Sequence, residues 1–526
     1  GDIWNTASVT NMQNIFSYAV AFNQDIGNWN TANVTNMSQM FNRARAFNQD
    51  IRTNGDIWNT ASVTNMQNMF RDAVAFNQDI GNWNTAKVTN MQGMFQNAAI
   101  FNQDIRTNGD IWSTANVTNM QRMFRDAVVF NQDIGNWNTA KVTNMQEMFQ
   151  NAAVFNQDIR TNGDIWNTAN VSNMQGMFRD AVVFKGDISG WNTASVADMS
   201  YMFNRAEVFN QDIKTNGDTW NTANVTNMQN MFRDAVAFNQ DIGNWNTAKV
   251  TNMQEMFQNA SVFNGDISGW NTAKVTNMQA MFQNAAAFNQ DISSWDVFKV
   301  ASRTNIFTGS GLASSSASHP FWPPTGCLNI ERTVTPNTKA ELLTAIKSPP
   351  DAGKAPNDQR WNRINTYAIT DMSALFQYNT TFNDAINCWD TRKVTNMQNM
   401  FKNASAFNGD ITKWQTSSVT NMQEMFHLAT QFNQNIGSWN TANVTNMSYV
   451  FFKASRFNQN ISNWNIGSAT NMFRMFGEAS AFVQDLSSWD VSRKTTTRMF
   501  TGATEMQQPA NKTSKWPQGC SGGSCG

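Results

Sequence analysis

Residues 133–157 read DIGNWNTAKVTNMQEMFQNAAVFNQ, and copies of this 25-residue unit fill most of the 526-residue chain. A tryptophan marks each copy, and successive tryptophans lie 25 or 29 residues apart within each of two series. The series are Trp4, Trp29, Trp58, Trp83, Trp112, Trp137, Trp166, Trp191, Trp220, Trp245, Trp270 and Trp295, then Trp389, Trp414, Trp439, Trp464 and Trp489. A unit this small cannot bury a core alone, so neighbouring units must stack and share one. The repeat therefore predicts elongated solenoids, not three or four globular domains.

The 29-residue units differ from the others by a four-residue insertion that turns NQDIGNWNT into NQDIRTNGDIWNT. The insertion occupies Arg52–Gly55, Arg106–Gly109, Arg160–Gly163 and, as KTNG, Lys214–Gly217. The first series is thus partly a 54-residue double repeat. We expect every second coil there to carry a bulge or a loop.

Proline divides the chain, because all nine prolines lie outside the repeats, between Pro320 and Pro356 or at Pro509 and Pro517. Proline removes a backbone donor, so its absence from the repeats fits continuously hydrogen-bonded coils. The predicted parts are a first array at 1–307, a closing segment and linker at 308–336, a helical N-terminal cap at 337–364, a second array at 365–507 and a closing tail at 508–526.

Within one coil, apolar residues at Val88, Met91, Met94 and Phe95 have the spacing of one helix face. Thr89 to Gln92 fits a capping box at the start of that helix. The FNQDI stretch is the best candidate for a short strand that pairs with its copies in parallel. The predicted fold is an α/β repeat solenoid of short strands and short helices, with an all-β solenoid as the alternative.

Composition argues against several functions. Lys and Arg total 37 and Asp and Glu total 38, so the chain lacks the basic excess of a nucleic-acid binder. It has only four cysteines and two histidines, His319 and His427, which we expect to be exposed. No apolar run approaches the length of a membrane-spanning helix. We expect no enzymatic activity, no nucleic-acid partner and no insertion into a membrane.

The pattern VTNMxxMFxxAxxFNxDIxxWxT resembles the BspA-like bacterial surface-protein repeats, which are relatives of leucine-rich repeats. The resemblance covers roughly 1–307 and 365–505, and residues 337–346 resemble the helical segment that often precedes such arrays. It implies an LRR-like solenoid at the cell surface or outside the cell that serves adhesion or structure. The family offers no catalytic residue to carry over.

One aspartate recurs in the FNQDI stretch, and a column of carboxylates could bind Ca²⁺. We expect no other cofactor. The alternative is that each carboxylate accepts backbone N–H groups within a turn, with nearby Lys and Arg offsetting its charge. The residues are Asp25, Asp50, Asp79, Asp104, Asp133, Asp158, Asp212, Asp241 and Asp291.

Arg-Asp dipeptides recur in alternate coils as a second charged column, which is either a recognition stripe or a solvated, self-neutralising helix end. They are Arg71-Asp72, Arg125-Asp126, Arg179-Asp180 and Arg233-Asp234.

Four cysteines allow three pairings. We favour Cys327–Cys388 and Cys520–Cys525, which would imply an oxidising compartment, over a reduced set.

Asn-x-Ser/Thr sequons recur at an exposed position of the repeat, as Asn33, Asn116, Asn170, Asn224 and Asn443. They are glycosylation candidates in a eukaryotic secreted protein and a by-product of the repeat in a bacterial one.

The sequence begins in mid-repeat with Gly1, Asp2, Ile3 and Trp4. If that end is real, the first coil presents unpaired backbone groups to a second copy, and the copies would assemble head to tail. The alternative is that upstream sequence is missing.

The leading functional hypothesis is an extracellular structural protein, the subunit of a fibre or appendage. Adhesion to a surface glycan or host protein is the second hypothesis, and ice binding is the third.

Overall fold

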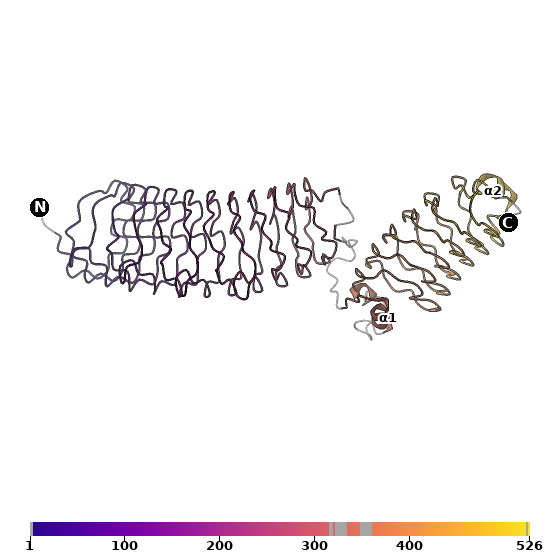
Figure 1. Cartoon of the computed structure of the whole chain (residues 1–526), viewed down its shortest axis with the longest axis horizontal. Helices are drawn as coiled ribbons and strands as arrows, with labels where there is room; N and C mark the ends of the chain where they lie inside the picture. The colour runs from indigo at the N-terminus through magenta and orange to yellow at the C-terminus, as the bar shows by residue number, and fades with distance from the viewer. Residues whose placement is uncertain (1–3, 315–318, 321–333, 348–359, 522–523) are drawn as a thin grey trace. The chain divides into compact units, whose positions relative to one another are not determined.

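The computed structural model describes residues 4–314, 319–320, 334–347, 360–521 and 524–526. The chain divides into two compact units, Gly1–Phe321 and Trp322–Gly526. In each unit the chain winds through coils that stack one on the next (Figure 1). The fold is therefore a repeat solenoid. Within the described residues, the helices are all too short or too polar to cross a bilayer.

Parallel β-bridges join equivalent asparagines of successive coils. In the first unit they connect Asn11 to Asn36, then Asn65, and so on to Ser302; in the second they run from Asp371 to Thr495. Around each bridge, alternate residues donate their N–H groups to the next coil, as Met66 does to the Asn90 carbonyl at 3.0 Å. Stacking thus satisfies backbone donors as well as burying side chains.

The predicted helix is not formed, because residues 146–151 and their copies are a run of turns, and the described arrays contain no helix at this position. Two residues of each run have positive φ, for example Glu147 at 53° and Asn151 at 54°, which breaks a right-handed helix. The capping box is also absent. The Thr143 hydroxyl donates to the Thr118 carbonyl at 3.2 Å, and the Asn144 side chain accepts the Gln146 N–H at 3.0 Å.

The predicted strand at FNQDI is also wrong, because the parallel bridges fall at the asparagine of VTNM instead. At FNQDI, side chains make the contacts between coils. The Asn77 side-chain oxygen accepts the Asn102 N–H at 3.0 Å, and the Gln103 amide donates to the Asn77 carbonyl at 2.9 Å. The described arrays therefore keep the solenoid but not the strand-and-helix detail predicted for its coils.

Columns of identical side chains fill the core. Trp137, Phe149, Phe155 and Ile159 are completely buried, as are their copies in most coils. The indoles of Trp245 and Trp270 stack at 6.3 Å between ring centroids. From Trp58 to Trp295 the buried indole N–H groups also have partners: that of Trp137 donates to the Ile105 carbonyl at 3.0 Å.

The second unit has structured ends. At its start, α1 (Lys339–Lys347) buries Leu342 and Ala345 in the core of the array, and η3 (Arg360–Arg363) buries Trp361 there. At its end, α2 (Pro509–Ser514) leads into a segment that takes up donors of the last coils. For example, the Phe500 N–H donates to the Cys525 carbonyl at 2.8 Å.

Candidate functional site

Each four-residue insertion forms a small hairpin that projects from its coil. In the second copy, Asn108 and Ile111 exchange backbone hydrogen bonds of 3.0 and 3.1 Å across the turn. Gly109, the first central residue, has a φ of 61°, which explains why glycine stands there in every copy. Arg106, Asn108, Gly109 and Asp110 are all exposed.

The base of the loop is held by an asparagine of the following coil. The Asn136 side chain accepts the Thr107 N–H at 3.1 Å and donates to the Thr107 carbonyl at 2.7 Å. Asn82 holds the first loop and Asn244 the fourth in the same way. In the third copy, Gly190 replaces this asparagine and stands beside Thr161, so that loop lacks the clamp.

A charged pair lies beside the clamp. The Arg106 guanidinium donates to the Asp104 carboxylate at 2.7 Å, and the Arg106 N–H also donates to it at 3.0 Å. These bonds, chiefly the one from the guanidinium, lower the pKa of Asp104. Asp104 therefore stays ionised, which makes it an acceptor and not a proton donor.

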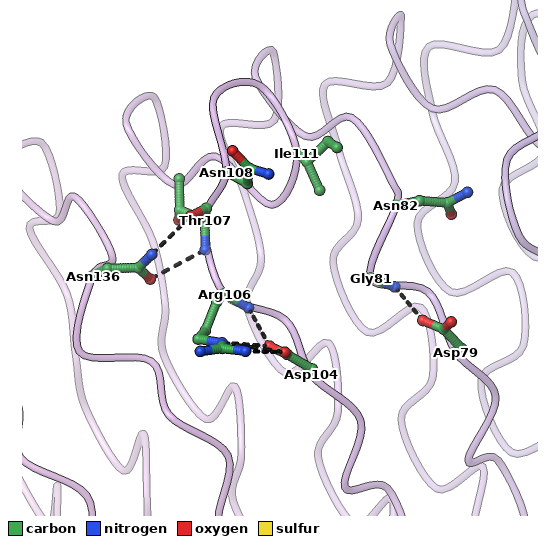
Figure 2. Close-up of a pocket in the computed structure, with 9 residues that line it drawn as sticks. All are labelled: Asp79, Gly81, Asn82, Asp104, Arg106, Thr107, Asn108, Ile111 and Asn136. Atoms are coloured by element: carbon green, nitrogen blue, oxygen red, sulfur yellow. Dashed lines mark hydrogen bonds and ion pairs between the residues drawn. The ribbon is translucent and has the colours of Figure 1, made fainter.

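These groups line a surface pocket of about 520 Å³ (Figure 2). Its lining residues are Asp79, Gly81, Asn82, Asp104, Arg106, Thr107, Asn108, Ile111 and Asn136. Figure 2 shows Asn108 and Ile111 at the loop, and the clamp and the charged pair at its base. A second pocket, of about 600 Å³, is lined by the residues 54 positions earlier, including Asp50, Arg52 and Asn54.

The aspartates proposed for Ca²⁺ lie in turns. Asp25, Asp79, Asp133 and Asp241 each accept the N–H of the glycine two residues later, at 2.8–3.1 Å. Asp50, Asp104, Asp212 and Asp291 bind the N–H two residues later in the same way. Asp158 accepts the Asp187 N–H from the next coil. Among the described residues, no group of three or more metal-binding side chains lies together.

The Arg-Asp column neutralises itself. Arg125 lies 3.4 Å from Asp126 and 2.7 Å from Glu147 of the next coil, and Arg233 makes the equivalent pairs with Asp234 and Glu255. Arg71–Asp72 and Arg179–Asp180 pair likewise, at 3.6 and 3.4 Å. These residues lie in turns, so the predicted helix end is wrong while the predicted mutual neutralisation describes the contacts.

Cys520 and Cys525 form a disulfide. Cys388 is buried and disulfide-bonded, whereas Cys327, its predicted partner, lies outside the described residues.

The sequon asparagines Asn33, Asn116, Asn170, Asn224 and Asn443 are exposed, and each amide donates to a carbonyl of the preceding coil at 2.7–2.9 Å. Glycan attachment there remains a prediction.

The predicted assembly end is only partly described. Gly1, Asp2 and Ile3 lie outside the described residues. The Trp4 side chain is 68% exposed, and its ring stacks on Trp29 at 5.8 Å.

The histidines are not exposed as predicted. His319 is half-buried and stacks on Phe307 at 4.3 Å. His427 bonds to Glu424 at 2.8 Å, and Glu424 also pairs with Lys402. Burial lowers the pKa of His427 more than Glu424 raises it, so the ring is neutral near pH 7. This cluster could not be recognised from the sequence, because Lys402 belongs to the preceding coil and lies far from Glu424 along the chain.

A family profile described as a Mycoplasma protein of unknown function, DUF285, matches residues 2–108, 107–216, 214–319, 351–443 and 410–516. No curated protein matches the chain. Among solved structures, a leucine-rich repeat protein from Eubacterium ventriosum is 11% identical, with 52% of this chain and 84% of that chain covered and a TM-score of 0.26. A leucine-rich cell surface protein from Faecalibacterium prausnitzii is 12% identical, with coverages of 53% and 82% and a TM-score of 0.29.

Proposed function

The chain belongs to the DUF285 repeat family, of the BspA-like kind that its sequence pattern resembles, and from this premise we propose that it is a non-enzymatic scaffold of the cell surface that binds glycans. The insertion loops of the first array are the proposed binding edge. The observation that carries the proposal is the recurrence of one polar pocket, with the same residues, 54 positions along the chain.

The pocket chemistry suits a polyhydroxylated ligand. Asp79 and Asp104 supply carboxylate acceptors, while Arg106 and Asn108 supply donors. Ile111 adds a partly exposed apolar surface against which a sugar ring can pack. The clamp and the charged pair fix the base of the loop before any ligand arrives, which reduces the entropy lost on binding.

Charge narrows the ligand class. The pocket around Arg106 carries two aspartates against one arginine, so its formal charge is negative. This disfavours an acidic polysaccharide and favours a neutral or amino-sugar polymer.

Repetition supports a polymeric ligand. Loops on every second coil are separated by about 10 Å along the stack, since stacked strands are about 4.8 Å apart. A polymer that contacts several loops gains affinity through effective concentration, even when each contact is weak.

The chain supplies its own control for a test. Replacing Arg106–Ile111 by Gly-Asn converts residues 102–114, NQDIRTNGDIWST, into NQDIGNWST, which differs from the NQDIGNWNT of the shorter coils only at Ser113. We expect the variant to stay folded, and we expect successive replacements at the other loops to weaken binding to immobilised neutral and amino-sugar polymers progressively. Binding that survives loss of all four loops, or that prefers polyanions, would refute the proposal.

The other functional hypotheses stay predictions. Self-assembly into a head-to-tail fibre depends on Gly1–Ile3, which lie outside the described residues. Ice binding depends on the exposed threonine column, whose hydroxyls donate to carbonyls of neighbouring coils, as Thr89 does to Thr64 at 3.2 Å. Electron microscopy of native material and thermal hysteresis test these two hypotheses.

A further inference from the structure

The chain contains six Asn-Gly pairs, all followed by aspartate, in two structural settings. Four lie in the insertion turns, at Asn54, Asn108, Asn162 and Asn216. Two lie in FNGDI stretches, at Asn264 and Asn408. We propose that the four insertion-turn asparagines are sites of spontaneous deamidation in the folded protein and that Asn264 and Asn408 are protected.

The reaction needs a side-chain amide that is free to reach the next backbone nitrogen. The glycine nitrogen loses its proton to water and attacks the asparagine Cγ, and the side-chain nitrogen leaves as ammonia. Water then opens the resulting succinimide at one of its two carbonyls. The net change is one amide and one water converted into a carboxylate and ammonium, as aspartate or isoaspartate.

The insertion turns meet this requirement. Asn108 and Gly109 are both exposed, as are their counterparts in the other three turns. The backbone N–H and carbonyl of Asn108 pair with Ile111, and no described residue hydrogen-bonds to its side chain, which lies at the loop (Figure 2). A β-carbon on Gly109 would have no neighbour within 4 Å, and no described backbone carbonyl accepts the Gly109 N–H.

The FNGDI asparagines are held by the next coil. The Asn264 side-chain oxygen accepts the Asn289 N–H and the Gln290 amide, both at 3.1 Å. The Asn408 side-chain oxygen accepts the Asn433 N–H at 2.9 Å and the Gln434 amide at 3.3 Å. Asn408 is exposed, as the insertion-turn asparagines are. Comparing its deamidation rate with theirs therefore separates the effect of hydrogen bonding from the effect of exposure.

The consequence falls on the candidate site, because Asn54 and Asn108 line the two described pockets. Each conversion replaces a donor by a carboxylate. Four conversions would move the formal net charge of the chain from −1 to −5. The acidity of the loop edge would thus increase with the age of the molecule. This inference does not depend on what the pockets bind.

The test is peptide mapping by mass spectrometry of the full folded chain, held over time at mildly alkaline pH. We expect the four insertion-turn asparagines to deamidate at least about tenfold faster than Asn264 and Asn408, because the latter must first give up two hydrogen bonds. In denaturant, where all six share the local sequence Asn-Gly-Asp, the rates should converge.

Isoelectric focusing provides a second readout, in which the folded chain should separate into a ladder of four acidic steps. Asn108→Gln, whose longer side chain disfavours the five-membered ring, should remove one step. Equal rates at all six sites in the folded chain would overturn the inference. Slower reaction in the insertion turns, or a difference that persists in denaturant, would overturn it too.

Discussion

Two residues of each coil, four positions apart, have a left-handed backbone conformation. Most are not glycine: Asn68 and Asp72 have φ of 54° and 57°, and Ala374 has 58°. Such a residue costs about 1–2 kcal/mol relative to a right-handed one. The coil accepts this cost because these residues donate their N–H groups to the next coil, as Asp72 does to the Gln96 carbonyl at 2.8 Å.

Glycine should relieve that cost. We expect Ala374→Gly to raise the free energy of unfolding of the second unit by about 1 kcal/mol. Ala406, a half-buried alanine of the same unit with negative φ, provides the control. Ala406→Gly should lower the free energy of unfolding by about 0.5–1 kcal/mol. Urea unfolding measures both, and equal effects would argue against the left-handed conformation.

The buried indole N–H groups lead to a second residue-scale prediction. Trp137→Phe leaves the Ile105 carbonyl without its donor in a dry core, which should cost about 1–3 kcal/mol beyond the loss of packing. Trp4→Phe, at the 68% exposed member of the same column, should change stability little. Calorimetry compares the two variants. A Trp137→Phe protein as stable as the wild type would show that the bond contributes nothing.

At the scale of the coil, the buried positions could be predicted from the sequence and the backbone conformation could not. Val142, Met145, Met148 and Phe149 are buried, as the nearly constant apolar character of these positions through the repeats indicates. Their spacing also fits one face of a helix. A helix was predicted because the pattern does not reveal that alternate N–H groups bond to the next coil. The carbonyls that accept these bonds belong to residues 24 or 28 positions further along the chain.

The insertion loop was predicted as a bulge or loop, but its pocket was not. The pocket depends on Asn136, which reaches back 29 residues to clamp Thr107. Asn136 is part of the GNW repeat and has no distinguishing mark in its own coil. The sequence does contain one sign of the role of this asparagine: glycine (Gly190) takes its place at the equivalent position after the third loop.

Because Gly190 stands where the other loops have an asparagine, we expect the backbone amides at the base of the loops to differ in hydrogen exchange. The Thr107 N–H is bonded by Asn136, whereas Gly190 leaves the Thr161 N–H without this acceptor. We expect the Thr161 amide to exchange its hydrogen faster than the Thr53 and Thr107 amides in the wild-type chain. Asn136→Gly should bring Thr107 to the rate of Thr161. Equal protection in the wild type would contradict the clamp.

Across the whole molecule, aspartates in turns make the free energy of unfolding depend on pH in the acidic range. Hydrogen bonds from Arg52, Arg106 and the Ser268 N–H are the largest causes that lower the pKa values of Asp50, Asp104 and Asp266. Because each folded-state pKa lies below its unfolded value near 3.8, the stabilisation is complete above that pH. It is lost as the pH falls through the folded-state values.

We therefore expect the midpoint of thermal unfolding to fall as the pH is lowered from about 5 to about 2. Asparagine provides the control, because Asn435 and Asn460 already occupy this turn position in the second array and accept the same N–H bond. Asp266→Asn and the equivalent substitutions should keep the turn and reduce the fall of the unfolding midpoint at low pH. If the midpoint falls as much in these variants as in the wild type, groups other than these aspartates cause the pH dependence.

The stacking of the coils underlies both the core and the loop edge, and a crystal structure of the full chain tests it most directly. We expect the indoles from Trp220 to Trp295 to form one column, with successive ring centroids 6.2–6.4 Å apart and planes within about 5° of parallel. Indoles dispersed among separate cores would contradict it.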